Sequence, residues 1–323
     1  AVEVRLLKEL LRTRGRSRAD TDYTLAVGGT WRPASHSEAL GMWRDRRVIV
    51  AGGTAGFGLV LARHLAAAGA RPLVVGRSSH GVRRALEACE RGAGGDRVRG
   101  TAADLRRPGE GTRVVGEALA ILGGLDDVVF CVGRSGRART LDTSGEALQE
   151  YLDANLLAAV ELTRAAADDV AAARGHLVYV GSLAGKFVLP FMGPYSVAKA
   201  ALAAYADAVR VELAPRGVHV LLVSPGPIRR AADDPAVAET VDRYAAEAAA
   251  AGLPASAAAP GGTTRLARLD PDRLADRVLD ACRRRTSELV VPARARLLAG
   301  LIAWFPDAGR RLLARIATRR DDG

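Results

Sequence analysis

The sequence has little of what marks several large classes of protein. Its 323 residues include three cysteines, at positions 89, 131 and 282, too few and too widely spaced for a disulfide framework or a CxxC metal site. No run reaches about 18 apolar residues, so we expect no membrane-spanning helix. The first twenty residues are charged rather than apolar, which argues against a signal peptide. We therefore expect a cytoplasmic protein without a bound metal.

Aromatic residues are also scarce, at 4% of the chain, although the formal net charge is +11. That charge gathers at the ends: residues 1–47 carry +4, residues 283–323 carry +6, and the long middle only +1. A nucleic-acid-binding protein would place a basic face within its fold, with aromatic side chains for stacking on single strands. The sequence therefore predicts no nucleic-acid binding.

Lysine is the third scarcity. Only Lys8, Lys186 and Lys199 are lysines, whereas 44 residues are arginine. A lysine in this chain departs from its usual choice of basic residue, so its position carries information about function.

What is present is a regular alternation of short apolar runs and helical patterns after Arg47. It is typical of βαβ units and predicts an α/β fold, a Rossmann-type doubly wound parallel sheet of about seven strands with helices on both faces. The expected strands are 48–51, 73–75, 98–102, 127–132, 175–180, 219–223 and 288–291. The expected helices are 56–68, 81–91, 109–121, 145–172, 195–214 and 271–284. The ligand crevice of such a sheet lies at the carboxyl ends of its strands.

The chain divides into an irregular extension, residues 1–46, with one short helix at 4–11, and a single domain, residues 47–323. Within the domain, the Ala-rich stretch 229–265 interrupts the alternation and is interpreted as a mobile lid over the crevice. Residues 293–320 predict one or two basic amphipathic helices. Such helices pack on the core or a subunit interface, or lie on an anionic membrane surface, and the sequence leaves this choice open.

A glycine-rich turn follows the first expected strand. Gly52, Gly56 and Gly58 lie between this strand and an apolar helix, in the run AGGTAGFGL. Such a turn lets the backbone approach a pyrophosphate, which then faces the N–H groups and positive dipole end of the helix. An ordinary glycine-rich turn is the alternative, but the position between the first strand and helix favours a dinucleotide site.

The end of the second expected strand predicts the choice of dinucleotide. An acidic residue there would bind the ribose hydroxyls of NAD, but the sequence has Arg77 and Ser78, which suit the 2′-phosphate of NADP. The alternative is that Arg77 is a solvated loop arginine. The sequence therefore favours NADP over NAD.

A candidate catalytic group surrounds one of the rare lysines. Tyr195 and Lys199 are four residues apart on a predicted helix and share one face, and Ser182 follows a predicted strand. An ammonium about 5 Å from a phenol, at an effective dielectric near 20, would lower the phenol pKa by roughly two units. We therefore expect Tyr195 to act as a general acid or base, with Ser182 hydrogen-bonded to a substrate oxygen.

These motifs together resemble the short-chain dehydrogenase/reductase family, in its compact oxidoreductase branch. The resemblance covers roughly residues 47–293. It is carried by AGGTAGFG, by Asn155, by GSLAGK and YSVAK, and by SPGPI at 224–228. The resemblance implies reduction of a ketone or aldehyde, or oxidation of the alcohol, by hydride transfer with a nicotinamide cofactor.

The resemblance also implies roles for single residues. Tyr195 would protonate the carbonyl oxygen, Lys199 would bind the nicotinamide ribose, Ser182 would polarise the substrate, and Asn155 would hold a water that links Lys199 to solvent. Asp104 would meet the adenine, and Pro225, Gly226 and Ile228 would line the nicotinamide. The implied cofactor-binding set is Gly52, Gly53, Thr54, Gly56, Phe57, Gly58, Arg77, Ser78, Asp104, Leu105, Cys131, Gly133, Tyr195, Lys199, Pro225, Gly226 and Ile228.

The sequence departs from the family pattern at three places, one of which is Arg230, where a threonine usually follows SPGPI. Ala51 stands where a threonine is usual, and FCVG at 130–133 replaces Asn-Asn-Ala-Gly, which changes how the central strand and cofactor are hydrogen-bonded. This motivates an alternative function, a non-catalytic NADP(H)-binding sensor or scaffold. By analogy with the family, the long helices 145–172 and 195–214 predict a homo-oligomer.

Overall fold

The structure is a computed structural model that describes residues 41–230, 237–254, 257 and 267–318. The chain divides into two units, residues 1–33 and 34–323, and every described residue belongs to the second. The helix expected at 4–11 lies outside the described residues, as does part of the expected lid.

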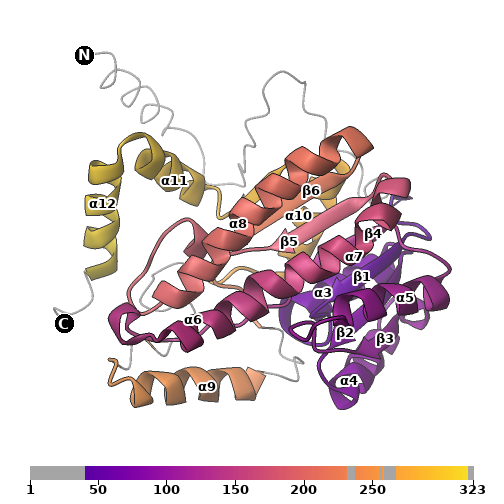
Figure 1. The fold of residues 1–323 in the computed structure, drawn as a ribbon, viewed down its shortest axis with the longest axis horizontal. Helices are drawn as coiled ribbons and strands as arrows, with labels where there is room; N and C mark the ends of the chain where they lie inside the picture. The colour runs from indigo at the N-terminus through magenta and orange to yellow at the C-terminus, as the bar shows by residue number, and fades with distance from the viewer. Residues whose placement is uncertain (1–40, 231–236, 255–256, 258–266, 319–323) are drawn as a thin grey trace. The chain divides into compact units, whose positions relative to one another are not determined.

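A seven-stranded parallel sheet forms the centre of the domain (Figure 1). Its order is β3-β2-β1-β4-β5-β6-β7, which confirms the predicted doubly wound α/β fold. The order reverses beside β1, where Ala51 pairs with Val75 of β2 on one side and with Phe130 of β4 on the other. The strands are β1 (Arg47–Ala51), β2 (Arg71–Gly76), β3 (Arg99–Ala102), β4 (Asp127–Phe130), β5 (His176–Val180), β6 (His219–Pro225) and β7 (Glu288–Val291).

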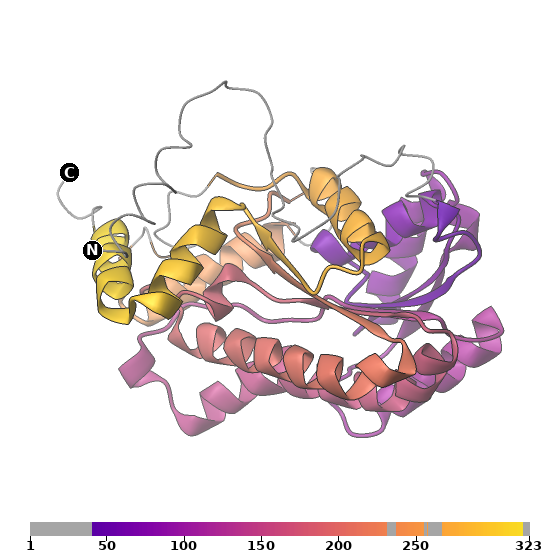
Figure 2. The same ribbon diagram turned by 90° about the horizontal axis from the view of Figure 1, so that it is seen from above.

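Helices cover both faces of the sheet (Figure 2). On one face lie α3 (Gly56–Ala67), α4 (Ser79–Glu90) and α10 (Pro271–Arg283). On the other lie α5 (Glu110–Leu122), α7 (Ala158–Ala172) and α8 (Gly193–Leu213). The remaining helices are α6 (Gly145–Leu152), α9 (Val237–Ala250), α11 (Arg294–Trp304) and α12 (Pro306–Thr318).

The sequence explains these elements locally. The central strands are buried on both faces, so nearly every position is apolar, as in VIVA of β1 and VLLV of β6. Several helices begin at a side-chain cap: Ser78 for α4, Ser144 for α6 and Asp270 for α10 each accept a backbone N–H. A five-residue π-helical turn, Asp153–Leu157, joins α6 to α7 within the single helix that the sequence predicts.

Part of the expected N-terminal extension packs on the core. Trp43 is only 1% exposed and lies among the side chains beneath α3 and α10. Arg46 donates two hydrogen bonds, both 2.6 Å, to the fully buried carboxylate of Asp127 on β4. The packing therefore extends into the described residues that precede β1.

Among the described residues, no helix combines the length and the apolar character needed to cross a bilayer.

Candidate active site

The glycine turn after β1 leaves no room for side chains. Gly52 has φ +77°, and a Cβ there would lie 2.9 Å from the backbone nitrogen of Val132. A Cβ on Gly58 would lie 2.2 Å from the carbonyl oxygen of Gly52. The turn and the start of α3 are therefore held in direct backbone contact, which only glycine permits.

The N-terminus of α3 opens beside this turn. The residue before the helix is Ala55, whose side chain cannot cap the first N–H groups, and the first turn holds no acidic residue. These N–H groups and the helix dipole suit an anion. With the glycine turn at its base, the site fits the diphosphate of a dinucleotide, so these residues are suited to the cofactor that the sequence predicts.

The second strand ends beside the same turn. A Cβ on Gly76 would lie 2.4 Å from the side chain of Thr54, so glycine lets Thr54 pack against β2. Arg77 is exposed, and the Ser78 hydroxyl accepts the backbone N–H of Gly81 at 3.1 Å. A basic side chain and a helix start thus occupy the place where the second strand meets a dinucleotide ribose.

Asp104, after β3, is already paired. Its two carboxylate oxygens accept from Arg106 at 2.8 and 2.6 Å, and this hydrogen bonding holds the carboxyl pKa below its usual value. Contact with an adenine, the role that the resemblance implies, would share a carboxylate already bound to Arg106.

The structure brings the predicted catalytic side chains together at the carboxyl ends of β4 and β5. Lys199 is buried, with Nζ 5.9 Å from the centre of the Tyr195 ring and 2.9 Å from the carbonyl oxygen of Val180, which accepts its proton. Ser182 lies beside Tyr195, close enough to lower the pKa of the phenol. The Ser182 hydroxyl accepts the N–H of Ala184 at 3.1 Å, which fixes it at the end of β5.

The electrostatics differ from the sequence prediction. Burial raises the pKa of Tyr195 to about 12, and the nearby hydroxyl of Ser182 lowers it only in part. Burial also lowers the pKa of Lys199 to about 8. The prediction that Lys199 lowers the phenol pKa is wrong for the chain by itself, because loss of water around the phenolate outweighs the attraction of a distant ammonium.

Asn155 lies in the π-helical turn and is fully buried. Its Nδ2 donates to the carbonyl oxygens of Arg134 and Tyr151, both at 2.9 Å. Its Oδ1 has no hydrogen-bond partner among the described residues. A Cβ on Gly133 would lie 2.7 Å from this oxygen and 3.2 Å from Lys199 Nζ, so both atoms border the same glycine.

The altered segment after β4 keeps its place in the site. The backbone N–H of Cys131 donates to the carbonyl oxygen of Ala51, and Cys131 lies against the glycine turn. Burial raises the thiol pKa to about 12, so Cys131 is neutral.

At the end of β6, the backbone N–H of Gly226 donates to the carbonyl oxygen of Val291, and Ile228 pairs with Leu269. These contacts fix the 225–228 segment in an extended form.

The remaining members of the implied cofactor-binding set, Gly53, Phe57 and Leu105, are packed against the glycine turn or against the sheet. Gly53 is buried, and a Cβ there would lie 2.8 Å from the carbonyl oxygen of Val50. Phe57, in the first turn of α3, is partly buried and packs against the core cluster on that face of the sheet. Leu105 is buried in the core cluster on the other face, which also contains residues of α5.

Sequence reasoning missed a second group beside the candidate catalytic residues. Arg137 is buried, its Nε donates to the carbonyl oxygen of Ala257 at 2.6 Å, and its guanidinium stacks on the Tyr244 ring at 4.5 Å. Glu247, on the same helix, accepts the backbone N–H of Arg137 at 3.1 Å. The contacts of Arg137 with Tyr244 and Glu247 therefore hold α9, within the expected lid, against the loop after β4. One arginine among 44 gave no signal in the sequence.

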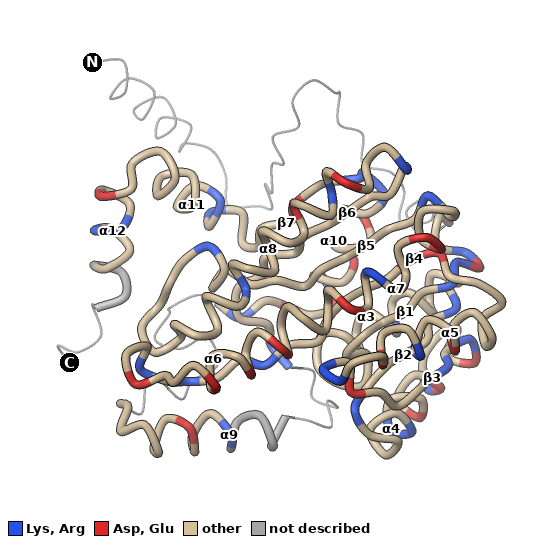
Figure 3. The backbone as a smooth tube through the Cα atoms, viewed as in Figure 1, with Lys and Arg blue, Asp and Glu red and all other residues tan. Residues whose placement is uncertain are grey.

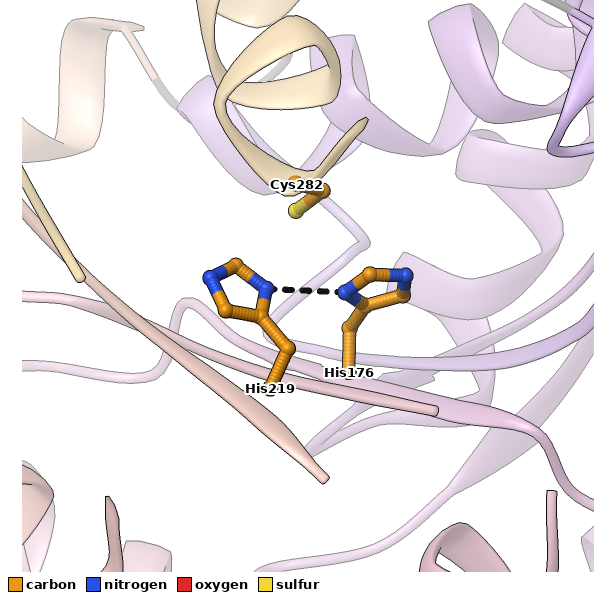
Figure 4. A group of neighbouring side chains, drawn as sticks. All are labelled: His176, His219 and Cys282. Carbon is orange, nitrogen blue, oxygen red and sulfur yellow. Dashed lines mark hydrogen bonds between the residues drawn. The ribbon is translucent and has the colours of Figure 1, made fainter. Parts of the chain in front are cut away.

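A cluster of possible metal ligands lies at the opposite edge, at the amino ends of β5 and β6 (Figure 4). The Nδ1 atoms of His176 and His219 are 2.9 Å apart, and the Cys282 sulfur points toward them. Because His219 Nε2 donates to the carbonyl oxygen of Thr286, its Nδ1 accepts the proton of His176 Nδ1. The imidazoles are therefore satisfied as a hydrogen-bonded core pair, and the absence of a metal stays a prediction.

Comparison with known proteins agrees with this geometry. A family model described as short chain dehydrogenase matches residues 46–241. The chain is 31% identical over 191 residues to Dehydrogenase/reductase SDR family member 7B of Danio rerio, covering 58% of this chain and 62% of that protein. It therefore spans less than two thirds of that relative's length.

Two other relatives are matched over more of their length. Hydroxysteroid 11-beta-dehydrogenase 1-like protein of Bos taurus is 31% identical over 260 residues, 80% of this chain and 83% of that protein. Ketoacyl reductase HetN of Nostoc is 28% identical over 247 residues, 76% of this chain and 78% of that protein.

The fold and the glycine turn define a dinucleotide-binding α/β domain, with Tyr195 and Lys199 near one another at the carboxyl edge of its sheet. The chain belongs to the short-chain dehydrogenase/reductase family, as its sequence motifs predict. Family membership implies an NAD(P) cofactor.

Proposed function

We propose that the protein is an NADP(H)-dependent carbonyl reductase, which converts a ketone or aldehyde to its alcohol and catalyses the reverse oxidation. The observation that carries the proposal is the convergence of Ser182, Tyr195 and Lys199 beside a glycine turn suited to a diphosphate. The name of the Nostoc relative, a ketoacyl reductase, supports carbonyl chemistry.

The cofactor, when bound, supplies the hydride. The turn at 52–58 and the start of α3 would hold its diphosphate, and Lys199 with residues 225–228 would hold its nicotinamide half. These groups come from β1, β6 and α8, whose carboxyl ends or first turns meet at one edge of the sheet. The chain's own contribution is to fix the ring and the carbonyl in reacting distance.

Tyr195 acts as the proton donor. A pKa of about 12 keeps its phenol protonated near neutral pH, and the developing alkoxide is a stronger base than the phenolate. Ser182 orients the carbonyl oxygen toward that proton. Lys199, with a pKa of about 8, can return a proton to the phenolate, and the unpartnered Oδ1 of Asn155 offers an acceptor for a water beside it.

The preference for NADP rests on the end of β2. Arg77 is exposed there, and Ser78 opens α4 with its hydroxyl beside the helix N-terminus. A guanidinium and a helix N-terminus both stabilise a phosphate dianion, whereas neither replaces the carboxylate that binds the ribose hydroxyls of NAD.

Replacing the phenol tests the reaction. We expect Tyr195→Phe to lower kcat/KM by about 10²- to 10⁴-fold with any ketone or aldehyde that the protein reduces, because the proton donor is lost. NADPH binding, followed by cofactor fluorescence, should be retained. The matched control is Tyr205→Phe on the same helix, whose ring packs on Tyr179 away from the site and should leave turnover unchanged.

Two results would contradict the proposal. Full activity in Tyr195→Phe would remove the assigned proton donor. Tight NADPH binding without turnover across a panel of aldehydes and ketones would favour the cofactor-binding sensor instead.

We further propose that the protein works in the cytoplasm as a homo-oligomer. Cys89 and Cys282 are buried and unpaired, which suits a reducing compartment. On α8, Val197 and Val211 are exposed on one side of the helix, and Val211 is 74% exposed. An apolar helix face of this kind suits pairing with the same helix of a second copy.

A further inference from the structure

The C-terminal helix pair, α11 and α12, is apolar on its inner side. Ala295 is buried, and Leu298, Ile302 and Leu313 pack with it against a small cluster of buried side chains. That cluster contains Leu183 and Phe187, which follow the catalytic residue Ser182, and Val290 of β7. The helix pair therefore packs against the start of the segment between Ser182 and Tyr195.

The outer side of the same pair is also apolar. Trp304 is 82% exposed and Leu297 is 70% exposed. They are seven residues apart and so project from one side of α11. Phe305 and Leu312 are exposed as well. These four residues, named here the tail patch, are large apolar side chains in water beside the active site.

The charge around the tail patch has one sign. Arg294 and Arg296 on α11 and Arg310 and Arg311 on α12 are all exposed, against one acidic residue, Asp307 (Figure 3). This gives the stretch 294–314 a net charge of +3. A tryptophan with neighbouring arginines is the composition that settles at the boundary between lipid headgroups and acyl chains.

We propose that the tail patch docks on an anionic phospholipid surface, and that the protein reduces an apolar carbonyl compound dissolved in that membrane. The second half rests on the proposed reductase function. The helix pair touches the bilayer with its outer side and the Ser182–Tyr195 segment with its inner side, so a lipid-soluble substrate would enter next to the catalytic residues.

The positive charge of the tail patch argues against a second copy of this chain as the partner that binds there. A two-fold interface would bring the patch, on a stretch with a net charge of +3, against the same charge on a second copy. An anionic bilayer instead supplies the opposite charge, and each basic residue near its surface strengthens binding by about fivefold.

Sedimentation with vesicles tests the docking. The full chain should pellet with vesicles of phosphatidylcholine containing about one third phosphatidylglycerol, and much less with phosphatidylcholine alone or at high salt. Trp304→Ser should weaken binding to both kinds of vesicle. Arg310→Ser with Arg311→Ser should weaken binding to the anionic vesicles by about 25-fold, the product of two fivefold steps.

Matched control variants distinguish docking through the tail patch from nonspecific adsorption to vesicles. Leu141→Ser removes a residue that is 98% exposed outside the tail patch. Arg83→Ser with Arg91→Ser removes the same charge at exposed positions of α4 and its end. Both control variants should pellet like the unaltered protein.

An activity measurement tests the substrate. The tail variants should reduce a small water-soluble ketone as fast as the unaltered protein, yet lose rate with a long-chain aldehyde held in anionic vesicles. If the reductase function fails, no aldehyde or ketone turns over, but the sedimentation result still stands by itself.

Three outcomes would overturn the proposal. One is equal pelleting of the tail variants and the unaltered protein. Another is a self-association in solution that Trp304→Ser abolishes, which would assign the patch to a second copy. The third is an equal rate with vesicle-held aldehyde in all variants, which would remove the membrane-dissolved substrate.

Discussion

At the scale of single residues, the candidate catalytic pair, Tyr195 and Lys199, shows how burial competes with charge. A lysine four residues from a tyrosine predicts a lowered phenol pKa if the ammonium lies about 5 Å away in a moderate dielectric. In the structure Lys199 Nζ lies 5.9 Å from the ring centre and donates to the Val180 carbonyl instead. The phenolate then loses its water without gaining a close cation, so the pKa rises to about 12.

The cofactor preference is a prediction about one side chain. Replacing Arg77 with Ala should raise the KM for NADPH by about 10- to 100-fold, because a charge-assisted hydrogen bond to the 2′-phosphate is lost. The KM for NADH should stay nearly constant. Steady-state kinetics with both cofactors and one carbonyl substrate measure the difference.

The control for this prediction is Arg83→Ala, which removes an exposed arginine one turn further along α4. It should change neither KM. Equal losses with NADPH and NADH in Arg77→Ala would show that this side chain does not distinguish the two cofactors.

At the scale of elements, local pattern predicted much of the architecture. The expected strands 127–132 and 175–180 are observed as β4 (Asp127–Phe130) and β5 (His176–Val180), because continuous apolar runs need burial on both faces. The π-helical turn was not foreseen, since its extra residue follows from placing Asn155 in the site and leaves no mark in apolar periodicity.

The helix α8 joins two roles on opposite sides. Its first turns carry Tyr195 and Lys199 toward the crevice, whereas Val197 and Val211 face outward. If α8 forms the subunit interface, Val211→Glu should shift the protein to a smaller species, because it places a charge in an apolar contact. Sedimentation velocity over a range of protein concentrations measures the shift.

A charge on the surface of the separate subunit should cost little, since Val211 is 74% exposed. The comparison variant Leu141→Glu introduces the same charge at a 98% exposed position and should leave the oligomer intact. An unchanged sedimentation profile in Val211→Glu would place the interface elsewhere.

At the scale of the whole molecule, the carboxyl and amino edges of the sheet carry different groups of residues. The glycine turn and the candidate catalytic side chains lie at the carboxyl edge. The amino edge gathers polar groups that tie the core together. Asp127 accepts from Arg46 and from the backbone N–H of His176, which in turn donates from its ring to His219. These bonds join β4, β5 and β6 to the segment before β1.

This network predicts acid sensitivity. Burial, with a smaller effect from His219, lowers the pKa of His176 to about 3, against about 6.5 in an unfolded chain. The unfolded state therefore takes up the proton first, and the free energy of unfolding falls as the pH drops from 6.5 toward 3. By pH 5 the loss is about 2 kcal/mol, before most carboxylates titrate.

Urea unfolding at pH 7 and pH 5 measures this loss. In His176→Asn the difference between the two pH values should shrink, although the variant is less stable at both. His80→Gln, which alters an exposed histidine, should keep the full difference. A pH dependence that is the same in His176→Asn and the unaltered protein would contradict the assignment.

The sequence by itself determined the sheet, its helices, the glycine turn and the spacing of Ser182, Tyr195 and Lys199, because periodicity and short-range spacing express local backbone geometry. Only the tertiary structure decided the rest. In the tertiary structure Lys199 donates to the carbonyl oxygen of Val180, and Arg137 contacts α9 and Ala257. His176 pairs with His219, and α11 packs beside the candidate active site. Each of these depends on which distant segments meet and how much water they exclude, and neither quantity is written in local sequence.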